Sequence, residues 1–290
     1  MIRYKTQRRI MITGFLFVPL VLLLLFTYLP SLFVFYFSFQ QWNGISDMEF
    51  VKFQNYVAIF TDPEIFKPLL NSFYYMVGAV VQMALGLFLA TLLSFKVVLK
   101  NVFKGTFFFP YLINSVAVGL MFSFFFRSDG VLNSILHIFA IRNTPDWLRL
   151  NFWNNVLLAG VSIWKYMGFN LVMFIGAIQS ISKEIYEAAE IDGANKFQIF
   201  FKIIYPAIRN IILLNLILAI KGAVSVYEIP YTMTGGTFGT STFVIKTLQI
   251  GISTRYRQVG LASAMSFVLL GIVLVVTVIQ RLMFKEKNDF

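Results

Sequence analysis

The stretch that decides the fold class runs from Met11 to Phe39 and reads MITGFLFVPLVLLLLFTYLPSLFVFYFSF. It carries no charged residue and exceeds the about 20 residues that an α-helix needs to cross the hydrocarbon core of a bilayer. Basic residues precede it, as they do in a signal peptide. The apolar run is too long for a signal peptide, however, and no small-residue cleavage site follows it. We therefore expect a first transmembrane helix over residues 11–39.

Five further apolar segments have a similar character, at about residues 70–95, 105–126, 155–180, 207–227 and 261–283. Each is expected to be an α-helix, because a helix satisfies its own backbone hydrogen bonds in lipid. The alternation and turn spacing of a transmembrane barrel are absent. Hydrophobic residues make up 58% of the chain and charged residues 13%, which differs from the composition of soluble domains. The sequence therefore predicts an all-α integral membrane protein, a single domain over residues 1–290 with six transmembrane helices.

The distribution of Lys and Arg predicts the orientation, since loops rich in these residues stay in the cytoplasm. With the N-terminus inside, the inner segments hold more Lys and Arg than the outer segments. We therefore expect both termini in the cytoplasm, with Lys165 and Lys221 left within spans. The net charge of +11 follows from this orientation and from contact with membrane lipid. Because the basic residues form no dense tract, nucleic acid is not expected as a partner.

Composition also limits the chemistry of the chain. Cysteine is absent, which excludes disulfides, thiolate metal sites and cysteine catalysis. His137 is the only histidine, so no metal site is expected. The spans contain no paired carboxylates and no nucleophile with a neighbouring base, so no catalytic residue is expected and an intramembrane enzyme is disfavoured.

One predicted outer loop contains an apolar run, Val131 to Ile141, that is too short to span the membrane. Two interpretations fit it equally. The run is either a helix that lies along the membrane interface or a buried connector helix that only packs. Both would account for the position of His137 within it.

The predicted cytoplasmic segment between spans four and five reads SKEIYEAAEIDGANKFQIFFKIIYP, residues 182–206. We expect two short helices around Gly193, because glycine tolerates the positive φ of a helix C-terminus. Ser182 fits the N-cap of the first helix. The second helix is amphipathic, and Pro206 ends it and opens span five.

The first of these helices presents an unusually small face, made by Ala188, Ala189 and Gly193. The charges of Glu187 and Asp192 lie beside it. Small residues let another backbone approach closely, so we expect a docking surface for another protein. The alternative is an ordinary amphipathic loop.

This segment resembles the EAA signature of ABC importer permeases. In that signature Glu-Ala-Ala is followed, after two residues, by Asp-Gly-Ala and later by a Pro near the next span. The matching residues are Glu187, Ala188, Ala189, Asp192, Gly193, Ala194 and Pro206. Tyr205 stands where the family commonly has Leu, and Ser182 where many members have Pro. The resemblance implies a type I importer bundle of six transmembrane helices, whose cytoplasmic coupling (EAA) helices contact an ATPase.

Further blocks make the chain similar to the sugar-uptake, maltose-transporter-like permeases, of raffinose or multiple-sugar type. These blocks are Phe50-Val51, Asn55-Tyr56, Phe109-Pro110, Gly130 to Asn133, Trp164, Gly168-Phe169, Tyr227-Glu228, Thr234-Gly235-Gly236, Gly260 and Ala262-Ser263-Ala264. Thr237-Phe238 replaces the usual Gly-Pro, which changes the outer loop. The resemblance implies uptake of a sugar, an oligosaccharide in particular, across a bacterial cell membrane.

The same resemblance implies the partners. Related importers combine two permeases, two ATPase subunits and an extracellular solute-binding protein. This chain has no Gly-x-x-x-x-Gly-Lys-Ser/Thr loop to hold phosphates, so ATP and Mg²⁺ are expected on the ATPase and no cofactor is expected here. The alternative is an ion-coupled secondary transporter that works alone. Such carriers usually have two repeated halves, and no internal repeat is evident.

Polar residues inside spans are costly and by default mark a pathway. A sugar site adds aromatic rings for the apolar faces of the sugar. These rules select candidates for the substrate pathway: Gln82, Trp164, Tyr166, Asn170, Asn215, Lys221, Tyr227, Glu228 and Tyr231. Each has an alternative role. Lys221 would extend to the interface or pair with Glu228, and the aromatic residues would pack between helices or form interfacial belts.

Overall fold

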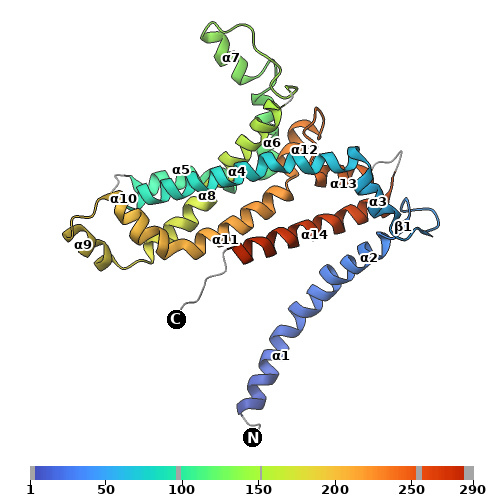
Figure 1. Ribbon diagram of the computed structural model, residues 1–290, viewed down its shortest axis with the longest axis horizontal. Helices are drawn as coiled ribbons and strands as arrows, with labels where there is room; N and C mark the ends of the chain where they lie inside the picture. The colour runs from blue at the N-terminus through green and yellow to red at the C-terminus, as the bar shows by residue number, and fades with distance from the viewer. Residues whose placement is uncertain (1–3, 96–98, 151, 253–256, 284–290) are drawn as a thin grey trace. The chain divides into compact units, whose positions relative to one another are not determined.

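The computed structural model describes residues 4–95, 99–150, 152–252 and 257–283 (Figure 1). The chain divides into two compact units. Unit 1 holds the described residues of Met1–Pro63 and Thr247–Gly271, and unit 2 holds those of Glu64–Lys246 and Ile272–Phe290. The helices α13 (Phe243–Ile252) and α14 (Val259–Met283) contribute residues to both units.

Unit 1 begins with a helical span whose middle is wound as a π-helix. It consists of α1 (Tyr4–Leu23), the π-helical turn η1 (Leu24–Tyr28) and α2 (Leu29–Phe37), and so confirms a first span close to residues 11–39. The backbone N–H of Leu29 bonds to the carbonyl of Leu24, just before Pro30. Proline lacks an N–H and its ring clashes with the carbonyl four residues earlier in an α-helix. The wider π turn displaces that carbonyl, so the helix continues through the proline.

Unit 1 also contains a short hairpin and a helix that were not predicted from the sequence. Strands β1 (Gln40–Gln41) and β2 (Glu49–Phe50) pair antiparallel, and α3 (Gln54–Thr61) follows. The hydroxyls of Ser38 and Tyr56 share a 2.7 Å hydrogen bond. The rings of Phe35 and Phe267 lie 5.0 Å apart, which joins α2 to α14.

Unit 2 is built around three long helices, α4 (Pro63–Ser94), α8 (Trp153–Gln179) and α11 (Tyr205–Val224). One buried cluster includes Tyr75, Leu158 and Ile229, and a second includes Phe174 and Ile208. Helix α5 (Lys100–Leu112) packs along α8 (Figure 1). A Cβ at Gly168 would lie 2.0 Å from the carbonyl oxygen of Phe107, so only glycine permits this approach.

The third predicted span, residues 105–126, was expected as one helix, and the structure forms this region from two helices with a sharp bend between them. Helices α5 and α6 (Ser115–Phe125) meet at 94°. Ile113 and Asn114 have extended ψ angles of 137° and 138°, and the Asn114 side chain accepts the N–H of Val116 at 2.8 Å as an N-cap. An N-cap residue leaves the helical conformation to satisfy an orphan N–H, and this bends the span.

Span five also differs from the prediction, because Pro206 does not separate it from the preceding helix. Helix α10 (Lys196–Ile199), the π-helical turn η2 (Phe200–Ile204) and α11 follow one another without a break. The N–H of Tyr205 bonds to the carbonyl of Phe200, which is the arrangement seen before Pro30. The proline is again accommodated by a π turn, and the amphipathic helix runs directly into the span.

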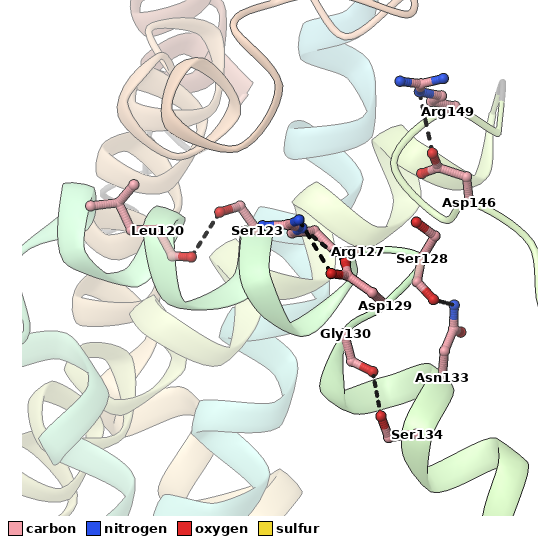
Figure 2. A network of polar contacts seen from close by, with 10 residues as sticks. All are labelled: Leu120, Ser123, Arg127, Ser128, Asp129, Gly130, Asn133, Ser134, Asp146 and Arg149. Carbon is pink, nitrogen blue, oxygen red and sulfur yellow. Dashed lines mark hydrogen bonds and ion pairs between the residues drawn. The ribbon is translucent and has the colours of Figure 1, made fainter.

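An arm after α6 carries the helix α7 (Val131–Ile138), which lies away from the long helices of unit 2 (Figure 1). Polar contacts hold its base, as Figure 2 shows: the Asn133 amide donates to the carbonyl of Ser128 at 2.9 Å, and Arg127 pairs with Asp129. Ile138 is 81% exposed. The interpretation as a buried connector was therefore wrong, and the interfacial helix stays a prediction.

The described part of the chain contains five helices that are long and apolar enough to cross a membrane, or six if the bent pair counts as one span. The fourth predicted span matches α8 and the sixth predicted span matches α14. The second span begins earlier than predicted, at Pro63. Large apolar side chains such as Phe15 and Phe26 are exposed. Lipid solvates such surfaces, which agrees with a membrane protein.

Candidate functional site

A cavity of about 370 Å³ lies inside unit 2, within the usual size range of small-molecule sites. Helices α4, α8 and α11 form most of its wall, and α12 (Glu228–Thr234) closes one side. Its polar side chains include Gln82, Ser162, Asn170, Asn215 and Glu228. A hollow with amides and one carboxylate inside an apolar helix bundle is suited to a polar, neutral ligand.

Aromatic rings form another part of this wall. The ring of Tyr111 lies 5.0 Å from that of Phe169 and 6.2 Å from that of Tyr166. Tyr75 and Tyr227 also line the cavity. Such rings offer flat apolar surfaces next to hydroxyls, a combination that suits a ligand with both C–H faces and polar groups.

Two fully buried polar atoms at this cavity lack a hydrogen-bond partner among the described residues. They are the Asn215 amide oxygen and the Tyr75 hydroxyl, and both are buried. The Asn215 nitrogen donates to the carbonyl of Ile211 at 2.9 Å, which fixes the amide in place. Leaving a buried polar atom unpaired costs about 1–3 kcal/mol. Water or a bound ligand is expected to pair with these atoms.

Lys165, in the middle of α8, is only 3% exposed. Its ammonium group donates a hydrogen bond to the carbonyl of Ile113, at the break between α5 and α6. It also lies close enough to Glu228 for an electrostatic interaction. The lysine therefore links three elements around the cavity: the bent span, α8 and the start of α12.

The second candidate site is the segment around α9 (Lys183–Ile191). The Ser182 hydroxyl accepts the N–H of Glu184 at 3.3 Å, which confirms the predicted N-cap. The helix ends before Gly193, which has a φ of +77°, and the N–H of Ala194 bonds to the carbonyl of Ala189 at 2.9 Å. This is the glycine-terminated helix end that the sequence predicted.

The next turn is fixed by a capping box. The Asn195 side chain accepts the N–H of Gln198 at 2.9 Å, and the Gln198 side chain accepts the N–H of Asn195 at 2.8 Å. The reciprocal bonds start α10 firmly. Together with Gly193 they set the angle between α9 and the helix that leads into span five.

The α9 segment exposes apolar side chains as well as its small face. Glu187, Ala188, Asp192 and Gly193 are exposed, whereas Ala189 and Ala194 are partly buried and pack against the cluster around Phe174. Ile191 is 87% exposed. No heavy atom lies within 4 Å of a Cβ built on Gly193. Exposed apolar residues around an open small-residue face indicate a contact surface.

A protein-family model described as the binding-protein-dependent transport system inner membrane component matches residues 82–287, more than half of the chain. This chain belongs to that family. It is also 34% identical over 278 residues to the probable ABC transporter permease protein YurN of Bacillus subtilis (strain 168), with 94% of this chain and 95% of that protein covered. A second relative, 29% identical with 92% of each chain covered, is the multiple sugar-binding transport system permease protein MsmF of Streptococcus mutans serotype c.

The permease also matches a solved structure, a bacterial alginate ABC transporter in complex with an alginate pentasaccharide-bound periplasmic protein. The TM-score is 0.86 at 19% identity, over 99% of this chain and 98% of that chain. The likeness shows the fold, and it confirms the predicted type I importer bundle.

Only some of the residues predicted to line the substrate pathway of the permease lie at this cavity. Of these residues, Gln82, Tyr166, Asn170, Asn215, Tyr227 and Glu228 line it. Trp164, Lys221 and Tyr231 do not line it. Trp164 packs edge-on against Phe122 at 5.3 Å, which is the packing role considered as its alternative. Lys221 is exposed on α11 and forms no ion pair with Glu228 in the described structure.

Sequence reasoning missed several residues of the permease cavity. Tyr75, Tyr111, Ser162 and Phe169 line it, and nothing in their local sequence separates them from other residues of apolar helices. Lys165 is different. A lysine within a span is itself a functional signal. Lys165 interacts electrostatically with Glu228, whereas the pairing of Glu228 with Lys221, considered as an alternative, is not found among the described ion pairs.

Proposed function

We propose that this permease carries a sugar, an oligosaccharide in particular, across the bacterial cell membrane as one membrane-spanning subunit of an ATP-driven importer. The unit 2 cavity is the observation that supports the substrate class most directly. It combines amides, one carboxylate and aromatic rings, and sugar hydroxyls and C–H faces need these groups. The names of MsmF and of the alginate transporter, which concern sugars and a pentasaccharide, agree with this substrate class.

Partner subunits supply the energy in this proposal. The permease has no catalytic residues of its own, and ATP and Mg²⁺ bind to two ATPase subunits. A second homologous permease completes the pathway, and an extracellular solute-binding protein delivers the sugar. The exposed face around Ala188 and Gly193 is the surface on which an ATPase subunit docks. When ATP binds, the movement of the ATPase subunit is transmitted through α10 and η2 to α11, because these three elements form one continuous helix.

The proposed orientation follows from the charge distribution. Both termini and the α9 segment lie in the cytoplasm, since basic loops stay inside. The hairpin, the α7 arm and the turn after α12 then face the exterior. This arrangement puts the α9 surface next to the ATPase and the outer loops next to the binding protein.

Uptake by the reconstituted complex tests the function. The complex with its ATPases and binding protein is placed in lipid vesicles. Transport of labelled oligosaccharides across the membrane is measured with and without ATP on the side that carries the ATPase subunits. We expect ATP-dependent entry of at least one oligosaccharide. Asn215→Leu, which removes the amide from the cavity, should reduce uptake by about tenfold, as loss of a well-placed hydrogen bond predicts.

The matched control is Asn210→Leu, the same change at an exposed position of α11. It should leave uptake unchanged. Uptake driven by an ion gradient without ATP would instead establish the secondary transporter and overturn the proposal. Equal uptake by the two asparagine variants would show that the cavity is not part of the transport pathway.

A further inference from the structure

Unit 1 contains a second cavity, of about 360 Å³, that the pathway does not use. The β1–β2 hairpin, α3 and the residues that lead into α14 surround it. Among the described residues, its lining is polar at most positions and includes one aromatic ring, Trp42, and one charged side chain, Arg257. A cavity of this size is large enough for a small ligand.

The walls of this cavity are tied together by hydrogen bonds between distant parts of the chain. The Asn55 amide donates to the carbonyls of Ser38 and Gln40, both at 2.9 Å. The N–H of Gly260 bonds to the carbonyl of Trp42 at 3.2 Å. A Cβ at Gly260 would lie 1.8 Å from the Gln40 oxygen, so glycine is required where α14 meets the hairpin. The cavity is therefore a built feature of unit 1.

The aromatic side of the cavity is held in one position. The Trp42 ring lies 4.6 Å from that of Phe37, and its Nε1 donates to the carbonyl of Ser46 at 3.0 Å. The Asn43 amide oxygen accepts the N–H groups of Ile45 and Ser46 and closes the loop. A fixed indole with its polar edge already satisfied offers its apolar face to a ligand.

The polar groups at this cavity, in contrast, retain hydrogen-bonding capacity. Within the described residues, the side-chain amides of Gln41, Gln54 and Gln258 make no hydrogen bond. Arg257 donates from Nε to the carbonyl of Gly251 at 3.1 Å, which leaves its two terminal nitrogens as donors. A guanidinium provides a paired donor geometry that matches a carboxylate.

We propose that this cavity binds one saccharide unit that bears a carboxylate. The sugar ring packs on Trp42, the amides of Gln41, Gln54 and Gln258 bond to its hydroxyls, and Arg257 binds the carboxylate. Within the described part of the lining there is no acidic side chain that would repel an anionic group. The inference rests on the proposed function, because it adds a subsite for the same class of substrate on the side of the membrane predicted to be external.

A binding experiment tests this site separately from transport. The complete importer in nanodiscs, without binding protein or nucleotide, is titrated with methyl glucuronide and with methyl glucoside, which differ only in the carboxylate. Saturation-transfer NMR reports binding of each sugar. We expect the glucuronide to bind more tightly than the glucoside. Arg257→Gln should weaken glucuronide binding by about tenfold, the usual loss for one charge-assisted bond.

Two further variants decide between sites. Arg281→Gln removes the same charge from the other end of α14 and should have no effect. Asn215→Leu, which is expected to reduce uptake by about tenfold, should leave glucuronide binding unchanged. Absence of glucuronide binding, equal binding by Arg257→Gln, or loss of binding in Asn215→Leu would each overturn the proposal. Failure of oligosaccharide uptake in the unmodified importer would instead count against the proposed function, since the binding measurement does not depend on transport.

Discussion

The ammonium group of Lys165 in α8 donates a hydrogen bond to the carbonyl oxygen of Ile113, at the break between α5 and α6. A break in a span frees backbone groups that lipid cannot satisfy. Lys165 therefore satisfies a carbonyl that the bend exposes, and it brings its charge towards Glu228 at the edge of the unit 2 cavity. One side chain thus contacts the bent span and also lies near the carboxylate that lines the cavity.

Replacement of this lysine should destabilise the bend. Lys165→Met keeps an apolar chain of similar length but leaves the Ile113 carbonyl unpaired, which costs about 1–3 kcal/mol. We expect a lower thermal unfolding midpoint for the purified complex and reduced uptake. Lys221→Met, at an exposed position of α11, is the matched control. The same unfolding midpoint for both variants would show that the hydrogen bond does not support the bend.

Tyr75 allows a test that separates binding from stability. Its hydroxyl is buried and has no partner among the described residues, so Tyr75→Phe should not lower the thermal stability of the complex. If the hydroxyl binds the transported sugar, the KM of uptake should rise about two- to tenfold, the worth of one neutral hydrogen bond. Tyr74→Phe is the control, because Tyr74 does not line the cavity. An unchanged KM in Tyr75→Phe would exclude the hydroxyl from substrate binding.

The spans were predictable from the sequence because length and apolarity alone specify them. The helix end at Gly193 was predictable too, since capping and positive φ are local properties. The break at Asn114 was not predicted, because the apolar residues around it indicate a continuous span. Only the short Asn-Ser pair indicates an N-cap there. The helix end predicted at Pro206 was wrong for a related reason. A proline ends most helices, and the π turn that accommodates Pro206 has no sequence signature of its own.

The cavities depended on tertiary structure that local patterns do not encode. Asn215 and Tyr166 were selected by residue type, and both line the unit 2 cavity. Trp164 was selected by the same rule, yet it packs against Phe122. Which face of a helix meets the cavity depends on its rotation against its neighbours, and an all-apolar helix carries little periodic signal to reveal that rotation.

The π turn before Pro206 gives a third prediction. A π turn holds one extra residue, which rotates the preceding segment by roughly a quarter turn relative to an α-helix. Pro206→Ala removes the cause of the π turn, so η2 should rewind as α-helix and turn the α9 segment relative to α11. We expect normal insertion but weaker stimulation of ATP hydrolysis by loaded binding protein. Pro30→Ala, which alters the similar turn η1 in span one, should leave this stimulation intact, and equal stimulation in both variants would argue against transmission through η2.

Gly193 provides the most direct test of the docking surface. Gly193→Asp adds a side chain and a charge to the face beside Ala188, and the positive φ of +77° adds about 1–2 kcal/mol of backbone strain. We expect the permease to insert into the membrane but to lose its ATPase subunits during purification, with loss of uptake. Gly239→Asp is the matched control, because Gly239 has the same φ of +77° and equally open space around its Cα, but lies in a predicted outer loop. Since both variants carry the same strain and charge, retention of the ATPase in Gly239→Asp alone would assign the loss to docking. Retention of the ATPase and normal transport in Gly193→Asp would show that the α9 segment does not dock in this way.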